Sequence, residues 1–478
     1  MRRKAQRRLC IVLSLATTMT LAFAASSAWA NVYASGLRQI APDTASYILN
    51  EDADAGVTVE VWKVGGGMVY SENLGAQAKG THSWTWNGTG YTPGSTYQMK
   101  IRASSAGYGT WTKLTTNTTL NNFYSPRGVS VNRNPGSQYF GRIYVSESVG
   151  GTTAAGRVTQ DGIYMLNADV TDAVGQGNTA RNGGVAWSTT NSPFRVEVGP
   201  DNNVYLGDWS DLHSGLWMGD PDFVSATELL DSTGRDSTGM NTTHGSISGF
   251  VVEGSGAART IYTCDEDLPS PTSGQRGSIW RYDIGTNSSF SGPPSGLLYD
   301  DLGTGGNLIF NYYNDLVRAS DGTWWYSQDR SGGSTDYLLS LMQISADGTS
   351  VLWKSVPALA SNSAADPLRR TRALAWDPVH DWLALATYNA GKVLIFDDDT
   401  KTIVATIEMG STATNRDVAF DAAGNLYVVD NITERLQIWS PPDGPNSFTT
   451  DSYFDIVPEP ATVLLLGVPA LFLRRRRA

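Results

Sequence analysis

Cysteine and histidine are scarce in this chain of 478 residues, which contains two cysteines and four histidines. Cys10 lies in an apolar N-terminal segment, so Cys264 is alone in the remainder and no intrachain disulfide is expected. Neither HxxH nor HExxH spacing relates the histidines, which argues against zinc and favours surface loop positions for His82, His213, His244 and His380. The fold must therefore rely on apolar burial and backbone pairing.

Long helical patterns, a G-x-S-x-G elbow, a P-loop and a Rossmann glycine pattern are also missing from the sequence. The glycine clusters at 65–67 and 303–306 lie in strand context, without the helix that a phosphate cradle needs. The sequence is instead rich in turn formers and aromatic residues, with 50 glycines, 15 tryptophans and 21 tyrosines. This composition predicts an all-β protein of many short strands joined by tight turns.

Both ends of the chain carry patterns typical of targeting segments. Residues 1–30 have a basic start, an apolar run and the small-x-small site Ala28-Trp29-Ala30, which predicts a signal peptide that signal peptidase cleaves after Ala30. Residues 457–478 contain a short apolar run of about 20 Å in helical form, less than a hydrocarbon core of about 30 Å. That run lies between the triplet Pro458, Glu459 and Pro460 and the arginines Arg474, Arg475, Arg476 and Arg477.

The C-terminal pattern resembles the PEP-CTERM sorting signal of Gram-negative bacteria, which the membrane enzyme exosortase processes. The resemblance implies transient retention in the inner membrane, with the arginines on the cytoplasmic side, and then release to the cell surface or extracellular matrix. An ordinary C-terminal anchor is the alternative, although it would not need the Pro-Glu-Pro triplet. The signal predicts a location and does not identify an activity.

Acidic residues outnumber basic ones, 46 to 35, for a formal net charge of −11. Removal of the five basic residues of the start and the four terminal arginines changes this charge to −20. Such an acidic body is a poor partner for nucleic acid or an anionic membrane surface. About 430 residues remain between the two signals, a length that suits two domains.

Residues 31–117 predict a small β-sandwich. Residues 58–64 alternate as a half-buried strand, a glycine turn follows, and a return strand begins at Met68. Further strands are expected at 82–86 and 97–103. This order of strands and turns, with Trp86-Asn87-Gly88, resembles the Ig-like domain of the flagellar hook-cap protein FlgD, a domain type that also serves as a spacer in exported proteins. No flagellar role follows from the resemblance.

Residues 118–124 are expected to form a linker, and a repeat fills residues 125–456. One strand pattern recurs at 128–131, 195–198, 249–252, 315–318, 373–376 and 417–420. A second strand follows each copy, at 142–145, 203–206, 260–263, 323–326, 381–384 and 425–428. Six copies predict a six-bladed β-propeller, or a seven-bladed one if an insertion hides a blade. The last copies resemble NHL and YVTN repeats, and the ring could close through 448–456 or through 118–124.

Polar residues mark one mouth of the predicted channel. The second strands end near acids, and the first strands begin near arginines, so both sets should meet at the same end of the axis. The candidate binding residues are Arg127, Glu147, Asp208, Asp265, Arg372, Arg416 and Asp430. Carboxylates gathered there could hold Ca²⁺, or the groups could form a polar ligand site. The alternative is a structural role, in which the acids and arginines pair between blades.

These patterns predict an exported, sorted protein with a non-catalytic binding propeller, whose partners are extracellular polysaccharide or envelope proteins. No catalytic residue and no cofactor other than possible Ca²⁺ is predicted. Two alternatives stay open: a metal-dependent hydrolase or lyase similar to gluconolactonase-like or virginiamycin-lyase-like propellers, and a purely structural spacer. Fold analogy alone does not choose among them.

Overall fold

A computed structural model describes residues 31–187, 192–210, 215–230, 246–265, 268, 278–300, 313–329, 340–355, 368, 370–388, 391–410 and 414–458. The expected signal peptide, and the sorting signal from Glu459 onward, lie outside these ranges. Strands dominate the described part, with two short 3-10 turns, η1 (Thr119–Asn121) and η2 (Gly256–Ala258). No helix in these ranges is long and apolar enough to cross a membrane.

The N-terminal domain is a sandwich of two antiparallel sheets, as the sequence predicts. One sheet has the order β1-β2-β5, from β1 (Ala34–Ala41), β2 (Thr44–Leu49) and β5 (Gly80–Thr85). The other has the order β30-β6-β3-β4, from β3 (Ala53–Lys63), β4 (Met68–Gln77), β6 (Tyr97–Ser105) and β30 (Asn446–Asp455). Alternate residues of β6 are buried, and these face a core that includes Trp84, Trp86 and Ile456.

The second domain consists, in the described residues, of six sheets of short strands. Three correspond to the first three repeats: β8 (Pro126–Val131), β9 (Ile143–Glu147) and β10 (Gly162–Leu166); β11 (Arg195–Val198), β12 (Val204–Asp208), β13 (Gly215–Gly219) and β14 (Ala226–Leu230); β15 (Ile247–Glu253), β16 (Thr260–Asp265), β17 (Ser278–Asp283) and β18 (Gly296–Asp300).

The other three sheets follow the same plan. They are formed by β19 (Asn314–Arg318), β20 (Trp324–Gln328), β21 (Leu341–Ile344) and β22 (Val351–Lys354); β23 (Thr371–Asp377), β24 (Trp382–Thr387), β25 (Lys392–Asp397) and β26 (Thr402–Glu408); β27 (Asn415–Phe420), β28 (Leu426–Asp430), β29 (Arg435–Ser440) and β7 (Thr112–Lys113).

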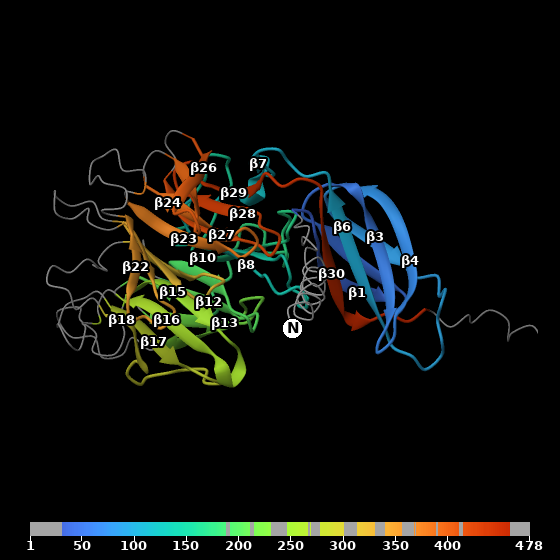
Figure 1. The fold of residues 1–478 in the computed structure, drawn as a ribbon, viewed down its shortest axis with the longest axis horizontal. Helices are drawn as coiled ribbons and strands as arrows, with labels where there is room; N and C mark the ends of the chain where they lie inside the picture. The colour runs from blue at the N-terminus through green and yellow to red at the C-terminus, as the bar shows by residue number, and fades with distance from the viewer. Residues whose placement is uncertain are drawn as a thin grey trace, which may run out of the picture.

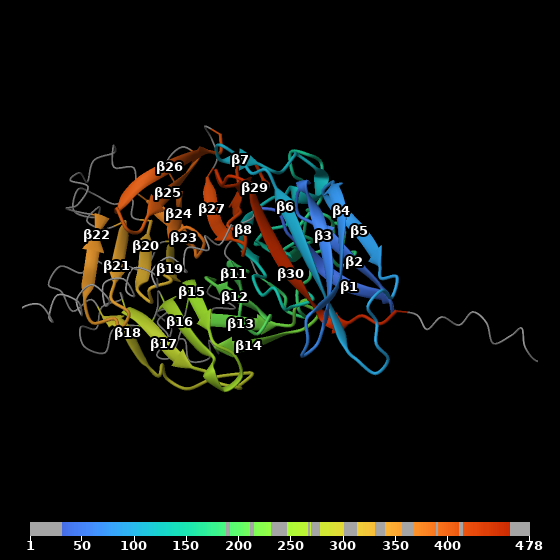
Figure 2. The same cartoon turned by 45° about the vertical axis from the view of Figure 1, so that its right-hand side comes forward.

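The first strands of the six sheets lie around a common axis. Each of these strands contacts the next one around the ring, in the order β8, β11, β15, β19, β23 and β27. The ring closes because β27 also contacts β8. Figure 2 places these strands toward the centre, with β18, β22 and β26 at the periphery. The domain is therefore a β-propeller, whose sheets bury their faces against their neighbours.

The propeller is inserted into the sandwich, which the sequence did not indicate. We predicted that residues 446–455 belong to the propeller, and this is wrong, because β30 pairs antiparallel with β6 in the sandwich (Figure 1). The entering segment completes the last blade instead: Lys113 of β7 pairs with Trp439 of β29, and Asn122 forms a bridge with Arg435. The segment 118–124 is thus part of that blade rather than a free linker.

The two domains pack against each other through a small buried contact. Tyr33, beside β1, packs against Phe140 of the first blade, with ring centroids 5.1 Å apart, and Phe448 of β30 stacks on the same phenylalanine. Gly141 has a φ of 75°, and a Cβ there would lie 2.8 Å from side-chain atoms of Ser35 and Tyr33. Only glycine allows the blade to approach β1 this closely.

Candidate functional site

Two of the predicted mouth arginines meet at one tyrosine that the sequence analysis did not select. Arg127 is the second residue of β8, at the irregularity between Pro126 and Gly128; Arg416 is the second residue of β27, and Tyr313 immediately precedes β19. The Arg127 Nη1 and Arg416 Nη1 groups both donate to the Tyr313 hydroxyl oxygen, at 2.7 Å and 2.5 Å. Three blades therefore converge on one hydroxyl group at the mouth.

The third predicted arginine, Arg372, lies over the same tyrosine, with its guanidinium carbon 4.5 Å from the ring centroid. Its Nε donates to Asp329 at 2.6 Å, and the Nε of Arg370 donates to the other oxygen of that carboxylate, also at 2.6 Å. Both guanidinium groups stack on Tyr388, at 4.2 Å and 3.4 Å. Arg370 and Asp329 thus extend the arginine mouth, which we define as Arg127, Tyr313, Asp329, Arg370, Arg372 and Arg416.

The predicted acids accept hydrogen bonds from residues of their own blades. Asp208 accepts from Ser192 Oγ at 2.6 Å and from Ser210 N at 2.7 Å, and Glu147 accepts from Ser125 N. Asp265 and Asp430 likewise accept from backbone N–H groups of the residues that follow them. Burial raises the pKa of Glu147 to about 8 and that of Asp208 to about 7, although these hydrogen bonds lower both.

The geometry therefore separates the seven candidates into two groups. Arg127, Arg372 and Arg416 come together around Tyr313. Asp208, Asp265 and Asp430 accept backbone N–H bonds from residues that follow their strands, and Glu147 accepts from Ser125 N, before β8. Within the described ranges, no group of three or more His, Cys, Asp or Glu side chains is arranged to hold a metal ion. The hydrogen bonds described above for Glu147, Asp208 and Asp430 stay within their own blades, and the pairing of acids with the mouth arginines remains a prediction.

Arg195 closes the channel just beyond the mouth. It begins β11 and reaches across the axis, where it pairs with Asp417 of β27 and lies 3.7 Å from Asp315 of β19. It also donates to the backbone carbonyls of Ser248, Arg372 and Arg416. All three charged side chains are less than a tenth exposed. One side chain therefore links the second blade to the four that follow it.

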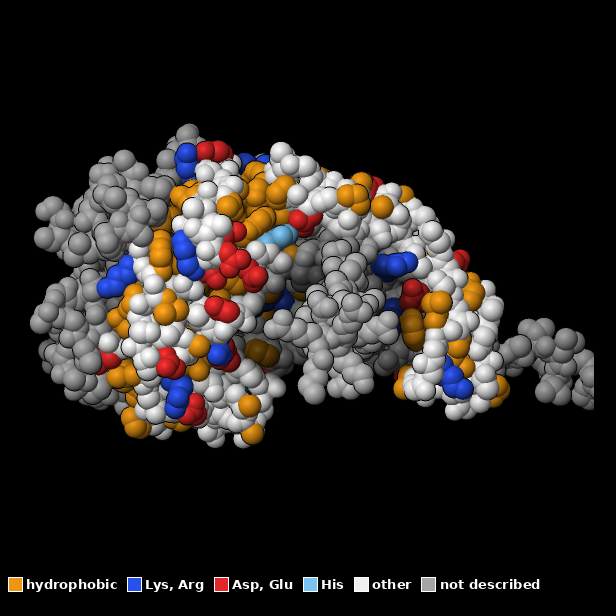
Figure 3. All heavy atoms as spheres, in the orientation of Figure 1, with side chains coloured by type: hydrophobic (Ala, Val, Ile, Leu, Met, Phe, Trp, Pro, Cys, Tyr) orange, Lys and Arg blue, Asp and Glu red, His pale blue; other side chains and the backbone are white. Residues whose placement is uncertain are grey.

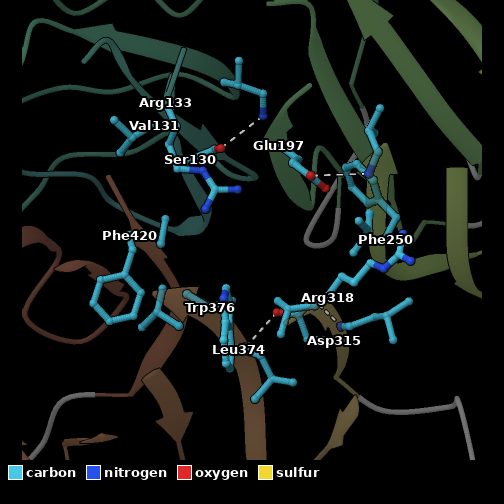
Figure 4. Close-up of a pocket in the computed structure, with 18 of the residues that line it drawn as sticks. Ser130, Val131, Arg133, Glu197, Phe250, Asp315, Arg318, Leu374, Trp376 and Phe420 are labelled. Carbon is cyan, nitrogen blue, oxygen red and sulfur yellow. Dashed lines mark hydrogen bonds between the residues drawn. The ribbon is translucent and has the colours of Figure 1, made fainter. Parts of the chain in front are cut away.

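A cavity of about 800 Å³ occupies the channel on the far side of Arg195. Arg195, Asp315 and Asp417 form its inner end, and the ends of the six inner strands form its wall. Figure 4 shows Arg133, Glu197, Arg318, Trp376 and Phe420 around this space. Burial raises the pKa of the Glu197 carboxyl to about 8.

Polar side chains of this cavity accept hydrogen bonds from backbone N–H groups along the inner edges of the blades. Ser130 Oγ accepts from Val198 N, a Glu197 carboxylate oxygen accepts from Val252 N, and Asp315 accepts from Leu374 N (Figure 4). Each bond joins a side chain of one blade to the innermost strand of the next. It therefore gives a partner to a backbone N–H on the side of that strand that faces away from its own sheet. The cavity residues consequently have a structural role that explains their polarity.

Sequence reasoning missed Tyr313, Asp329, Arg370 and Arg195. Arg195 begins an inner strand, as Arg416 and Arg372 nearly do, so the same positional rule would have selected it. Tyr313 and Asp329 lie just outside the repeated strand pattern, and no sequence signal identifies them. Of the histidines, His380 is not a surface residue: its side chain is 13% exposed and bonds to Asp377 and Asp443. His213 and His244 lie outside the described residues.

The fold and mouth define an all-β protein in which a propeller is carried by an Ig-like sandwich. The family model of the FlgD Ig-like domain matches residues 34–107, which agrees with the resemblance seen in the sequence. No curated protein matches the chain.

Solved structures similar to this chain include a protein of unknown function from Bacteroides thetaiotaomicron, 10% identical, which covers 87% of this chain and 100% of its own with a TM-score of 0.40. A gluconolactonase from Xanthomonas campestris is 16% identical over 70% of this chain and 91% of its own, with a TM-score of 0.41. The WD40 β-propeller domain of Doa1 is 10% identical over 70% and 97%, with a TM-score of 0.40. The propeller assignment itself rests on the sheet order and the ring of inner strands.

Proposed function

We propose that this chain is an exported, exosortase-sorted protein of a Gram-negative cell surface or extracellular matrix. Its propeller binds extracellular polysaccharide or another envelope component and does not catalyse a reaction. The signal-peptide pattern of residues 1–30 and the Pro458-Glu459-Pro460 pattern support export and sorting. The sandwich acts as the spacer between the sorting signal and the propeller.

The arginine mouth is the observation that carries the binding function. Guanidinium groups from different blades converge there on a tyrosine hydroxyl, and buried N–H groups of Arg372 and Arg416 have no hydrogen-bond partner. Buried donors without partners cost free energy unless a ligand satisfies them. Two such donors, from neighbouring blades and beside the same tyrosine, support a binding role for the mouth.

Co-sedimentation of the full chain with the surface polysaccharide of its host tests this proposal. We expect the polysaccharide to retain the chain and to keep its length on size-exclusion chromatography. Arg416→Met should reduce retention, and Arg133→Met, on the far side of Arg195, should not. A hydrolase or lyase would shorten the polysaccharide, and a structural spacer would not be retained, so either result would overturn the proposal.

A further inference from the structure

The arginine mouth offers hydrogen-bond donors that only an acceptor-rich ligand can use. The Tyr313 oxygen already accepts two N–H bonds, so both of its lone pairs are occupied and its own O–H remains available to donate. Arg372 Nη1 and Arg416 Nε are buried donors without a partner. Arg372 as a whole is 5% exposed. These three groups come from three consecutive inner-strand regions around one point of the axis.

The charge of the mouth is also unbalanced. Arg370 and Arg372 share one carboxylate, that of Asp329, and the nearby Arg416 guanidinium donates to the Tyr313 hydroxyl oxygen. Burial, together with the charges of Arg127 and Arg372, lowers the pKa of Arg416 to about 10. A bound anion would relieve this repulsion. The chain as a whole is acidic, and Figure 3 shows Asp and Glu interspersed with Lys and Arg over the propeller face in that view, whereas arginines predominate among the described residues of the mouth.

The shape of the mouth favours a planar carboxylate on a sugar ring. Arg370 and Arg372 already bind the two oxygens of the Asp329 carboxylate through their Nε groups, which shows that the guanidinium planes suit this geometry. Aromatic rings provide the adjoining surface. Phe194, Trp209 and Tyr313 contact one another with centroids 5.2–5.4 Å apart, and Trp209 and Tyr313 are partly exposed. Tyr388 on the other side is 40% exposed. Such rings offer flat apolar faces against which a pyranose can pack.

We infer that the arginine mouth binds the carboxylate of an acidic sugar residue, of the hexuronic acid class, within an extracellular polysaccharide. This inference rests on the proposed function and specifies its ligand. The carboxylate accepts from the Tyr313 hydroxyl and, once the two buried guanidinium groups turn outward, from Arg372 Nη1 and Arg416 Nε, and the sugar ring lies against the aromatic faces. Binding requires no movement of Arg195, which seals the channel below the ligand.

Calorimetric titration of the full chain with trigalacturonate and with its methyl ester tests the ligand class. The ester has the same rings without the negative charge. We expect the free acid to bind at least about tenfold more tightly, because hydrogen bonds to an ionised acceptor are roughly twice as strong as those between neutral groups. Its affinity should fall as salt concentration rises.

Tyr313→Phe removes one donor and keeps the ring, and Arg372→Met removes a charge, so each should weaken trigalacturonate binding about tenfold or more. Arg133→Met serves as the matched control and should bind as the wild type does. Because Arg372→Met also removes an ion pair, its fold is checked by its circular dichroism, and Tyr313→Phe tests the same point independently.

Three outcomes would overturn the inference. Equal binding of acid and ester, unchanged by the variants, would mean that the propeller binds sugar without using the mouth, and the proposed function would stand. Tighter binding of a sulfated trisaccharide than of trigalacturonate would assign the mouth to sulfate esters. If the chain binds none of these sugars and no host polysaccharide, the proposed function fails as well.

Discussion

Arg195 shows how a single residue can hold a propeller together along its axis. Its guanidinium group is buried, as are the carboxylates of Asp315 and Asp417, and those carboxylates also accept backbone N–H groups from the blades that follow them. The three charges are stable in the interior only because they compensate one another. Removal of one partner leaves the others desolvated and unpaired.

We therefore expect Arg195→Met to reduce the free energy of unfolding by about 3–5 kcal/mol, measured by urea denaturation. Combining it with Asp315→Asn and Asp417→Asn should recover part of this loss, because the amides keep an acceptor for the backbone without the charge. Arg133→Met, at an exposed position, should change stability by less than about 0.5 kcal/mol. A loss below about 1 kcal/mol for Arg195→Met would show that the axis does not depend on this residue.

His380 is a second residue with a measurable role, since it pins the segment that leads from the propeller back to the sandwich. Nδ1 bonds to Asp377 at 2.5 Å, Nε2 bonds to Asp443 at 3.0 Å, and the ring stacks on Trp382. Burial lowers the pKa of His380, but the hydrogen bonds to Asp377 and Asp443 outweigh burial and raise it to about 9. The protonated form therefore stabilises the folded state.

A raised pKa means that this stabilisation is complete below about pH 6.5, the ordinary histidine pKa, and is lost as the pH rises to about 9. His380→Asn should consequently be less stable than the wild type at pH 6, by at most about 3 kcal/mol, and the difference should shrink by pH 9.5. Thermal melts at both pH values measure it. His82→Asn, in the sandwich, is the control. A stability difference that stays constant with pH would contradict the assigned protonation.

At the scale of elements, β30 follows the propeller in the sequence but pairs with β6, which precedes it, and so completes the sandwich. Thr450 Oγ1 donates to Ala34 O, Ser452 Oγ accepts from Met99 N, and Ile456 beyond the strand is fully buried in the sandwich core. The strand therefore forms backbone hydrogen bonds with β6, and the segment that follows it contributes Ile456 to the core between the two sheets.

We expect truncation after residue 445 to destabilise the sandwich by more than about 3 kcal/mol, because it removes a paired strand and a buried isoleucine. Truncation after residue 458 is the matched control and should leave stability unchanged. Limited proteolysis should cut the shorter protein within residues 31–107 and spare the propeller. Equal protection of the two truncated proteins would mean that β30 is dispensable.

The strand order explains which parts of this fold could be predicted from sequence. Local alternation and turns identify β3, β4 and β6 and the repeated first and second strands, because these features depend on neighbouring residues. The partner of β30 could not be predicted, since any edge strand of either domain would suit its pattern. Arg127, Arg372 and Arg416 were predicted because they recur at one position of the repeat, whereas Arg370 lies outside it. Tyr313 and Asp329 belong to no repeat position, so only the fold shows that they meet the arginines.

At the scale of the whole molecule, insertion of the propeller into the sandwich determines which domain lies next to the C-terminal segment. Val457 N donates to Pro42 O at 2.8 Å, and Pro458 lies beside Gly88, so the chain leaves the fold at the sandwich. Pro458, the first residue of the proposed sorting triplet, follows β30 by three residues. A protein held by this end would carry its propeller beyond the sandwich.

The intact mass of the protein extracted from the surface of its native host is the most direct test of this account. Proline restricts its own backbone and that of the preceding residue, which keeps the Pro458-Glu459-Pro460 stretch extended and accessible for processing. We predict a mature chain that begins at Asn31 and ends near Pro460, and an unprocessed inner-membrane form when the triplet is changed to alanine. A surface protein that still ends at Ala478 would contradict the sorting account and identify the C-terminal segment as a plain anchor.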